Sequence, residues 1–265
     1  MLGYINSFSY VYYVMSSQPL NDTKMTKNEK SELKKILVDI VDTHWERYLK
    51  EKNKKDLLKS KNNSWINKGS SVLSDVCSSL SRSRDSSMGN LYEKIVNAIS
   101  EYFNVKTFST IKGLTIKQSG KKWIIDLAFE RDGVTYLVEI KLGGNLDNKK
   151  AISEANALSV RKQTLIENSL AENVETYLGI ITLGNGETSP DEWEMGRVSL
   201  GFDRSQVLVE RELFDFVSNN TEVFDFLVTE IQPVVMGGWN EVERKIITKY
   251  ISKEWFIEFI NNTYK

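Results

Sequence analysis

The feature that most constrains this chain is a pair of short apolar segments with charged residues inside them. Residues 123–129 surround Asp126 with Trp, Ile, Leu and Phe, and residues 136–142 surround Glu139 and Lys141 in a similar way. Both segments are rich in β-branched and aromatic residues, which favour strands over helices. A charge inside an apolar strand is costly to bury unless it has a partner or a metal ion. The two segments are therefore predicted to be strands that carry a charged site.

The sequence Arg131-Asp132-Gly133 between the two segments predicts a tight turn, so the strands form an antiparallel hairpin. Side chains alternate across a strand, which places Glu139 and Lys141 on one face, and the hairpin sets Asp126 beside them. The two carboxylates can then converge on one cation, with the lysine ammonium at the edge of the same pocket. The alternative is a hairpin whose outward face carries these three charges as cross-strand ion pairs.

A Glu-x-Lys spacing by itself is a weak signal, because this chain contains it three times: at Glu32/Lys34, Glu139/Lys141 and Glu243/Lys245. The first and last lie in helical patterns, where such pairs are ordinary solvated charges. Only the middle pair lies in an apolar strand next to a strand with an embedded aspartate. Two carboxylates that bind Mg²⁺ through hard oxygen ligands, with a lysine nearby, are the groups that hydrolysis of a phosphodiester needs. The lysine can position or deprotonate the attacking water and can stabilise charge on the phosphate.

Outside the hairpin, the hydrophobic period predicts further helices and strands. Helices are predicted over residues 26–61, 62–80, 89–103, 147–172, 212–217, 222–231 and 241–262, and strands over 105–117, 122–130, 134–142, 176–183 and 206–209. The serine-rich residues 81–87 are predicted to form a polar loop, with Ser86 and Ser87 as caps of the next helix. This order predicts an α/β fold, a mixed central β-sheet flanked by helices with an N-terminal helical region. We expect a helical region at residues 1–87 and a core with C-terminal helices at 88–265.

Composition argues against several other classes of protein. With 265 residues, 40% of them hydrophobic, the chain can bury one sizeable core. Its apolar runs are far shorter than the roughly 20 residues of a membrane-spanning helix, and residues 1–15 lack the basic start and cleavage site of a signal peptide. A single cysteine and a single histidine, His44, argue against a disulfide framework, a zinc site and a Ser/His or Cys/His triad. We therefore expect a cytoplasmic protein.

The net charge of −1 conceals an uneven distribution of charged residues. Residues 22–68 contain 13 Lys and Arg against 8 Asp and Glu, and residues 185–265 contain 8 against 15. A nearly neutral chain can therefore present a basic face, which permits nucleic-acid binding through a local groove. The basic stretch of the first helix is expected to be a solvated face, with DNA clamping or subunit contact as the other interpretation.

Residues 89–217 resemble the core of the PD-(D/E)xK nuclease superfamily, and more narrowly type II restriction endonucleases. That core is a helix, an antiparallel hairpin that carries an Asp and a Glu-x-Lys, a further helix and then further strands, which matches Asp126, Glu139 and Lys141 here. Gly143-Gly144 after the catalytic strand and the segment 207–217 also resemble such enzymes. One departure is Ile125, which stands where the family name has a proline.

The resemblance implies a restriction-endonuclease-like fold and a Mg²⁺-dependent endonuclease that cuts double-stranded DNA at a specific short site. It also implies that Mn²⁺ can substitute and that Ca²⁺ supports DNA binding without cleavage. A homodimer and a cognate DNA methyltransferase, encoded nearby in a prokaryotic genome, are the implied partners. The alternatives are a structure-specific repair, recombination or defence nuclease on the same core, and a non-catalytic DNA-binding protein of the same fold.

The resemblance extends the candidate site beyond the hairpin. Glu93 matches a glutamate that many members use as a further metal or water ligand, so the implied catalytic set is Glu93, Asp126, Glu139 and Lys141, with the three acids as metal ligands. A helix N-terminal acid favoured by the dipole is the alternative for Glu93. The candidate DNA contacts are Arg82, Arg84, Asn145, Lys149, Lys150, Arg161, Lys162 and Gln163. Arg161 and Gln163 have the geometry to read guanine or adenine in the major groove, and an exposed helix surface is the other interpretation of residues 161–163.

Overall fold

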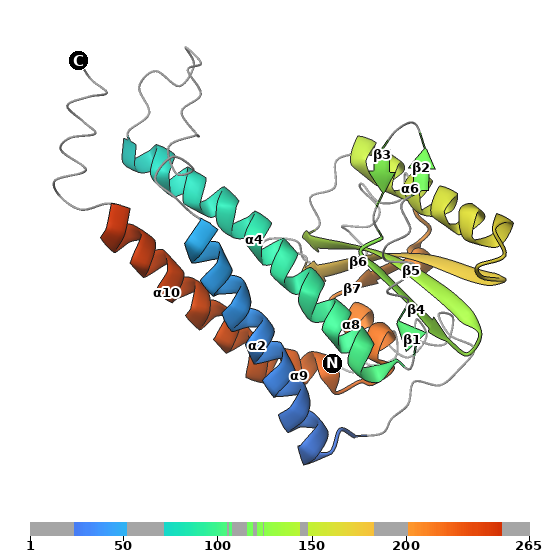
Figure 1. The fold of residues 1–265 in the computed structure, drawn as a ribbon, viewed down its shortest axis with the longest axis horizontal. Coiled ribbons are helices and arrows are strands. Elements are labelled where there is room, and N and C mark those ends of the chain that lie inside the picture. The colour runs from blue at the N-terminus through green and yellow to red at the C-terminus, as the bar shows by residue number, and fades with distance from the viewer. Residues whose placement is uncertain are drawn as a thin grey trace, which may run out of the picture. The chain divides into compact units, whose positions relative to one another are not determined.

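The computed structural model describes residues 24–51, 72–104, 106–107, 116–118, 121–123, 125–143, 148–182 and 201–250. These residues form an α/β fold with a mixed β-sheet flanked by helices, as predicted (Figure 1). The chain divides into two compact units, Met1–Glu29 with Ile95–Asp225 and Lys30–Lys94 with Phe226–Lys265. Helix α4 (Val72–Phe103) contributes to both units, and the domain boundary predicted after Ser87 falls inside this helix.

The first unit is built on a five-stranded sheet in the order β1-β4-β5-β6-β7. Its strands are β1 (Lys106–Thr107), β4 (Leu127–Arg131), β5 (Val134–Gly143), β6 (Asn173–Thr182) and β7 (Val207–Val209). β1, β4 and β5 pair antiparallel, whereas β5, β6 and β7 pair parallel, so the sheet is mixed. The carboxyl ends of the three parallel strands therefore lie at one edge, where open α/β sheets usually bind ligands. A separate two-stranded sheet pairs β2 (Ile116–Gln118) with β3 (Lys121–Trp123).

Helices cover both faces of the central sheet (Figure 1). Helix α6 (Asn148–Glu167) packs on one face, where its inward residues share a core with the strands: Ala151, Leu158, Leu165, Leu137 and Leu178. Helix α8 (Arg211–Ser218) packs on the other face. A Cβ atom on Gly179 of β6 would lie 2.7 Å from Cδ1 of Leu213, so only a glycine lets α8 approach the sheet this closely.

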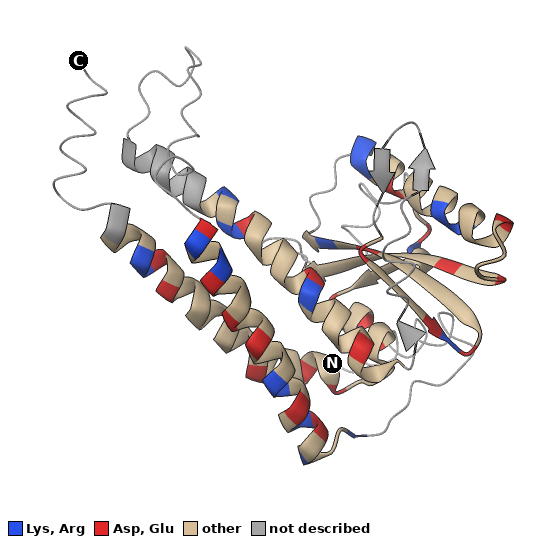
Figure 2. Cartoon of the chain, viewed as in Figure 1, with Lys and Arg blue, Asp and Glu red and all other residues tan. Residues whose placement is uncertain are grey.

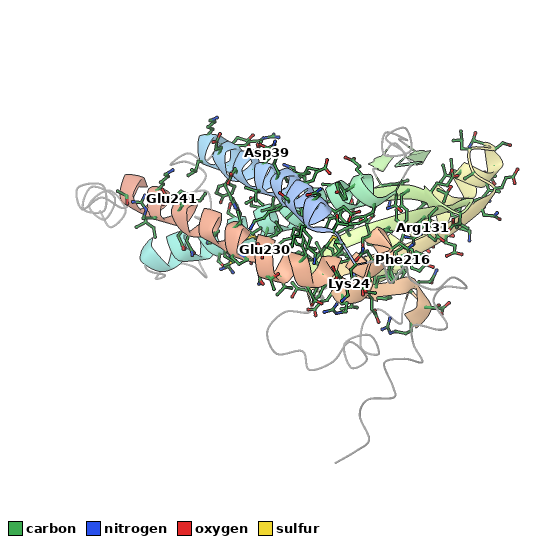
Figure 3. The ribbon with its side chains drawn as sticks, turned by 90° about the horizontal axis from the view of Figure 1, so that it is seen from below. Lys24, Asp39, Arg131, Phe216, Glu230 and Glu241 are labelled. Atoms are coloured by element: carbon green, nitrogen blue, oxygen red, sulfur yellow. The ribbon has the colours of Figure 1, made fainter. Side chains whose placement is uncertain are left out.

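The face under α8 carries an aromatic cluster around Arg131. Phe129, Tyr136 and Phe216 have ring centroids 5.1 to 5.9 Å apart. The Arg131 guanidinium lies 5.2 to 5.5 Å from these three centroids and donates to the carbonyl of Phe216 at 2.8 Å (Figure 3). Such contacts are favourable because the aromatic faces are electron-rich and the guanidinium is largely desolvated. The cluster fixes the turn end of strands β4 and β5 to α8.

The described residues of the second unit are helical. This unit contains α2 (Lys27–Glu51) from Lys30 onward, α4 up to Lys94, the π-helical η4 (Leu227–Ile231) and α10 (Gln232–Tyr250); α9 (Val223–Phe226) lies at its boundary with the first unit. Lys and Arg are interspersed with Asp and Glu along α2, whereas the charged residues of α10 lie in its second half, from Glu241 onward (Figure 2). Trp45 packs on Trp239 with ring centroids 5.6 Å apart, and a Cβ on Gly238 would lie 2.3 Å from Trp45 Cδ1. None of the described helices is both long and apolar enough to span a membrane.

The single histidine, His44, is buried between α2 and α4 within the second unit. Its Nε2 lies 2.8 Å from Ser87 Oγ, and its Nδ1 lies 3.4 Å from Lys94 Nζ. An ammonium can only donate, so Nδ1 accepts from Lys94 and the protonated Nε2 donates to Ser87. A catalytic triad would need a carboxylate at Nδ1 rather than a cation. The contact with Ser87 is therefore a buried structural hydrogen bond.

The polar loop predicted at residues 81–87 is wrong, because these residues lie inside α4. Ser83 Oγ lies 2.6 Å from Tyr48 OH, and Ser87 bonds His44, so two serines of this segment contact α2. Serine costs only about 0.5 kcal/mol in a helix relative to alanine. Tertiary hydrogen bonds, which no local pattern reveals, offset that cost. Arg82 and Arg84 therefore project from a helix and not from a loop.

The predicted strand 122–130 is also wrong as one element. β3 ends at Trp123 in the two-stranded sheet, and β4 starts at Leu127 in the central sheet. The predicted strand 105–117 corresponds to β1 and the start of β2, and residues 105 and 108–115 lie outside the described part.

Several predicted helices differ in their bounds. The helix predicted over 147–172 ends at Glu167, because Ser169 adopts a φ of 53° and Leu170 N donates to Leu165 O at 2.9 Å, a Schellman ending. The two helices predicted over 222–231 and 241–262 form one continuous run through η4. The ends of the helices predicted over 26–61 and 241–262 lie outside the described residues, as does the start of the one over 62–80.

We expect the free energy of unfolding to fall as the pH is lowered from 6.5 to 4. Burial, and then the charge of Lys94, lower the pKa of His44 from 6.5 to about 4. Between these values the unfolded chain binds a proton that the folded chain does not, which destabilises the fold by up to roughly 3 kcal/mol at pH 4. Urea denaturation across this range should show a larger pH dependence for the wild-type protein than for His44→Gln. Equal slopes would contradict the assignment to His44.

Candidate active site

A two-residue turn joins β4 and β5 into an antiparallel hairpin, as predicted, and fixes the register of the two strands. Asp132 and Gly133 have φ values of 53° and 77°, the backbone of a two-residue type I′ turn. This turn pairs Arg131 with Val134, and the register continues to Leu127 opposite Val138. One step further along the same register, Asp126 falls opposite Glu139. The chemistry of the turn therefore decides which acidic residues face each other.

Asp126 occupies a bend immediately before β4. Its Oδ2 accepts a hydrogen bond from Ile140 N of β5 at 2.9 Å, and its carbonyl accepts one from Asn97 Nδ2 of α4, also at 2.9 Å. The side-chain oxygen of Asp126 thus accepts a hydrogen bond from a strand N–H, and a helix side chain donates a hydrogen bond to its main-chain oxygen. These bonds hold Asp126 beside β5 and account for the break in the predicted strand.

Glu139 is the buried centre of the site, with a side chain 7% exposed. Lys141 Nζ donates to its Oε1 at 2.5 Å, and Arg161 NH1 donates to its Oε2 at 2.9 Å. Burial alone would raise the pKa of Glu139, but the charges and hydrogen bonds of Lys141 and Arg161 outweigh it and lower the pKa. The carboxylate is therefore held ionised between two cations.

Lys141 connects the carboxylates of the site. Burial would lower its pKa, but Glu139 most strongly, and then Asp126 and Glu154, attract the ammonium and raise the pKa. Its Nζ also lies 3.2 Å from Oε1 of Glu154 on α6. The structure thus brings together Asp126, Glu139 and Lys141, which the sequence placed in one pocket. Cross-strand ion pairing, the alternative for the hairpin, does not account for the contact between Glu139 and Lys141, which both lie on β5, or for their two partners on α6.

Among the described residues, no group of three or more His, Cys, Asp and Glu side chains is arranged to hold a metal ion. The acids that meet at the hairpin are two, Asp126 and Glu139. Hard oxygen donors on neighbouring strands suit Mg²⁺, which is usually bound by one or two carboxylates and keeps several waters or phosphate oxygens. The donor set therefore fits a site that substrate and water complete.

Glu93 lies on α4 in the second unit, half-buried and well inside the helix. The alternative that it is a helix N-terminal acid is therefore wrong, because α4 begins at Val72 and not near Gly89. The dipole favours acids only within the first turn. The role of Glu93 as a further ligand stays a prediction.

The predicted DNA contacts occupy different environments. Lys149 and Lys150 are exposed in the first turn of α6, which is basic (Figure 2), and Lys162 and Gln163 are exposed further along that helix. Arg82 and Arg84 are exposed on α4 in the second unit, and Asn145 lies outside the described residues.

Arg161 is not part of an exposed surface. It is 5% exposed, and its guanidinium binds Glu139 rather than facing solvent. The geometry therefore places Arg161 within the candidate site and corrects its predicted place among base-reading side chains. Burial of the guanidinium explains the difference, because a base edge cannot reach a side chain covered by the sheet.

Glu154 is the site residue that sequence reasoning missed. The signal that could have found it is the apolar stripe of α6, formed by Ala151, Leu158 and Leu165. Glu154 and Arg161 fall on this stripe, three residues after Ala151 and Leu158. A charged residue on a buried helix face needs a partner of opposite charge. The predicted strand with Glu139 and Lys141 could supply such partners.

A family model described as type II restriction endonuclease EcoO109I matches residues 28–234. The match covers most of the chain, and it includes α2 and α4 as well as the hairpin. A comparison with curated proteins finds no match.

We expect Glu139→Ala to lower the free energy of unfolding by about 3–5 kcal/mol, because it removes the carboxylate from a buried ion pair with Arg161. The control is Glu212→Ala, whose pair with Arg204 is 23% and 34% exposed and whose loss should cost about 1 kcal/mol or less. Equilibrium unfolding in urea measures both. Equal losses in the two variants would show that Glu139 is not the buried centre described above.

Proposed function

This chain belongs to the type II restriction endonuclease EcoO109I family, and we propose that it is a Mg²⁺-dependent endonuclease that cuts double-stranded DNA at a specific short site. The observation that carries the proposal is the meeting of Asp126, Glu139 and Lys141 at the hairpin of β4 and β5. Two carboxylates and one ammonium at one point of a sheet are the groups that phosphodiester hydrolysis requires.

Asp126 and Glu139 are the proposed protein ligands of Mg²⁺, with Glu93 as a further ligand. When bound, the metal neutralises charge on a phosphate oxygen and lowers the pKa of a coordinated water. Mn²⁺ should substitute, and Ca²⁺ should support DNA binding without cleavage. Asp126 is held by the Ile140 N–H and Glu139 by Arg161, so both carboxylates are oriented before a cation arrives.

Lys141 is proposed to act as a cation. Its neighbouring carboxylates raise its pKa, so it holds its proton more tightly than an isolated lysine does. A protonated lysine can donate hydrogen bonds to a phosphate oxygen or to the attacking water, and it stabilises the negative charge of the transition state.

The DNA backbone is proposed to lie along the basic start of α6. Lys149 and Lys150 are exposed there and can neutralise phosphates, and Lys162 and Gln163 are exposed on the same helix. The carboxyl ends of β5, β6 and β7 share the edge of the sheet from which α6 begins. Asn145, Arg82 and Arg84 remain candidates for further contacts.

Two-fold symmetric DNA sites favour a homodimer in which each subunit cuts one strand. The N-terminal helical region would then contact the second subunit or clamp DNA. A cognate methyltransferase that protects the host DNA is the expected partner in a prokaryotic genome, and the cytoplasm is the expected compartment.

Supercoiled plasmid incubated with the protein and Mg²⁺ should give discrete bands. A site-specific enzyme cuts every copy at the same positions, so the fragments should be constant between preparations. A smear, or nicking only at branched junctions, would favour the structure-specific nuclease. Binding with no cleavage in Mg²⁺ or Mn²⁺ would favour the non-catalytic protein.

Asp126→Asn, Glu139→Gln and Lys141→Ala should each reduce plasmid cleavage at least about a hundredfold, since even residues that only support metal ligands typically contribute 10- to 100-fold. Retarded migration of a cleavable fragment in Ca²⁺ should persist in all three variants. Glu175→Gln, on the same sheet but outside the site, serves as the control. Cleavage that survives unchanged in any of the three removes that residue from the proposed site.

A further inference from the structure

Helix α6 carries two opposite charges on the face that it buries against the sheet. Its stripe of Ala151, Leu158 and Leu165 belongs to the core, and Glu154 and Arg161 lie on the same stripe. Arg161 is 5% exposed, and the Glu154 side chain is 20% exposed. Apolar residues at both positions would pack without any cost of desolvating a charge. The charges therefore point to a role beyond packing.

Each of the two charges contacts one member of the Glu-x-Lys pair. Arg161 NH1 lies 2.9 Å from Oε2 of Glu139, and Glu154 Oε1 lies 3.2 Å from Nζ of Lys141. Glu139 and Lys141 are themselves 2.5 Å apart. The four side chains form a chain of alternating sign, Arg161–Glu139–Lys141–Glu154, in which the two inner members lie on β5 and the two outer ones on α6.

This arrangement gives each inner residue a second partner. Lys141 lies against Oε1 of Glu139, so a cation that binds this carboxylate competes with the ammonium. Arg161 holds the other oxygen and keeps the carboxylate oriented when Lys141 moves away. The Glu154 carboxylate remains an ion-pair partner for the Lys141 ammonium when a cation displaces it from Glu139.

We propose that α6 positions both halves of the Glu-x-Lys pair, with Arg161 fixing Glu139 for the divalent cation and Glu154 fixing Lys141 for the chemical step. This inference rests on the proposed function and deepens it. Arg161 contacts Glu139 and Glu154 contacts Lys141, so both are assigned as positioning residues that act through β5. Removal of Arg161 should therefore weaken cation binding, and removal of Glu154 should slow catalysis.

An effect of net charge alone on cation affinity would be opposite to an effect of positioning, so Arg161→Gln and Glu154→Gln distinguish the two explanations. If only the local potential mattered, loss of a positive charge in Arg161→Gln would tighten cation binding, and loss of a negative charge in Glu154→Gln would weaken it. Positioning predicts that Arg161→Gln weakens cation binding and that Glu154→Gln leaves it nearly unchanged.

The test combines calorimetric titration of the full-length protein with Ca²⁺ and single-turnover cleavage of plasmid at saturating Mg²⁺. Arg161→Gln should raise the Ca²⁺ dissociation constant about tenfold, the usual effect of removing a residue that orients a metal ligand. Glu154→Gln should keep that constant within about twofold and slow cleavage about tenfold. The matched controls are Arg204→Gln and Glu212→Gln, an Arg–Glu pair of the same unit that contacts β7 rather than β5.

Arg161→Lys guards against misfolding of the glutamine variant, because it keeps a positive charge beside Glu139 while losing the planar fork. It should weaken Ca²⁺ binding less than Arg161→Gln does, with circular dichroism spectra unchanged. Ca²⁺ binding as tight as wild type, or tighter, in both Arg161 variants overturns the proposal. Equal weakening in Glu154→Gln and Arg161→Gln overturns the division of roles. A wild-type protein that neither cuts DNA nor binds Ca²⁺ overturns the proposed function itself, and the positioning roles with it.

Discussion

The ion pair between Arg161 and Glu139 is the constraint on which the rest of the site depends. A carboxylate that is 7% exposed on its side chain loses most of its hydration, a cost of several kcal/mol that only close partners can offset. Arg161 and Lys141 supply those partners from two directions. The pair also joins α6 to β5 at one point, so the register of the helix on the sheet and the ionisation of the candidate ligand are fixed by the same contact.

The geometry of the hairpin follows from a short chain of local causes. The positive φ values of Asp132 and Gly133 select the turn, the turn selects the register, and the register sets Asp126 opposite Glu139. Arg131, held among three aromatic rings, anchors the turn end of the hairpin to α8 on the far face. One face of the hairpin is therefore used to hold it in place, and the other carries the charges.

The parts of this structure that sequence reasoning predicted are those decided by neighbours in the chain. The turn, the alternation along β5 and the α/β architecture all come from patterns a few residues long. The prediction of a polar loop at 81–87 was wrong because Ser83 and Ser87 form hydrogen bonds with Tyr48 and His44, which are far away in the sequence. Arg161 was read as a surface residue for the same reason, since its partner is on another element. Local composition cannot show where a distant partner will lie.

Topology nevertheless explains why these charges meet in the order they do. β5 and β6 are parallel neighbours, so the connection between them must return through a crossover, and α6 runs back along the sheet. The start of α6 therefore lies near the end of β5, and Lys141, the later strand residue, meets Glu154, the earlier helix residue. Glu139, two residues earlier on β5, then meets Arg161, seven residues later on α6. Had the two charges on α6 been exchanged, the same crossover would have set Arg against Lys and Glu against Glu, and the hairpin charges could not have been buried.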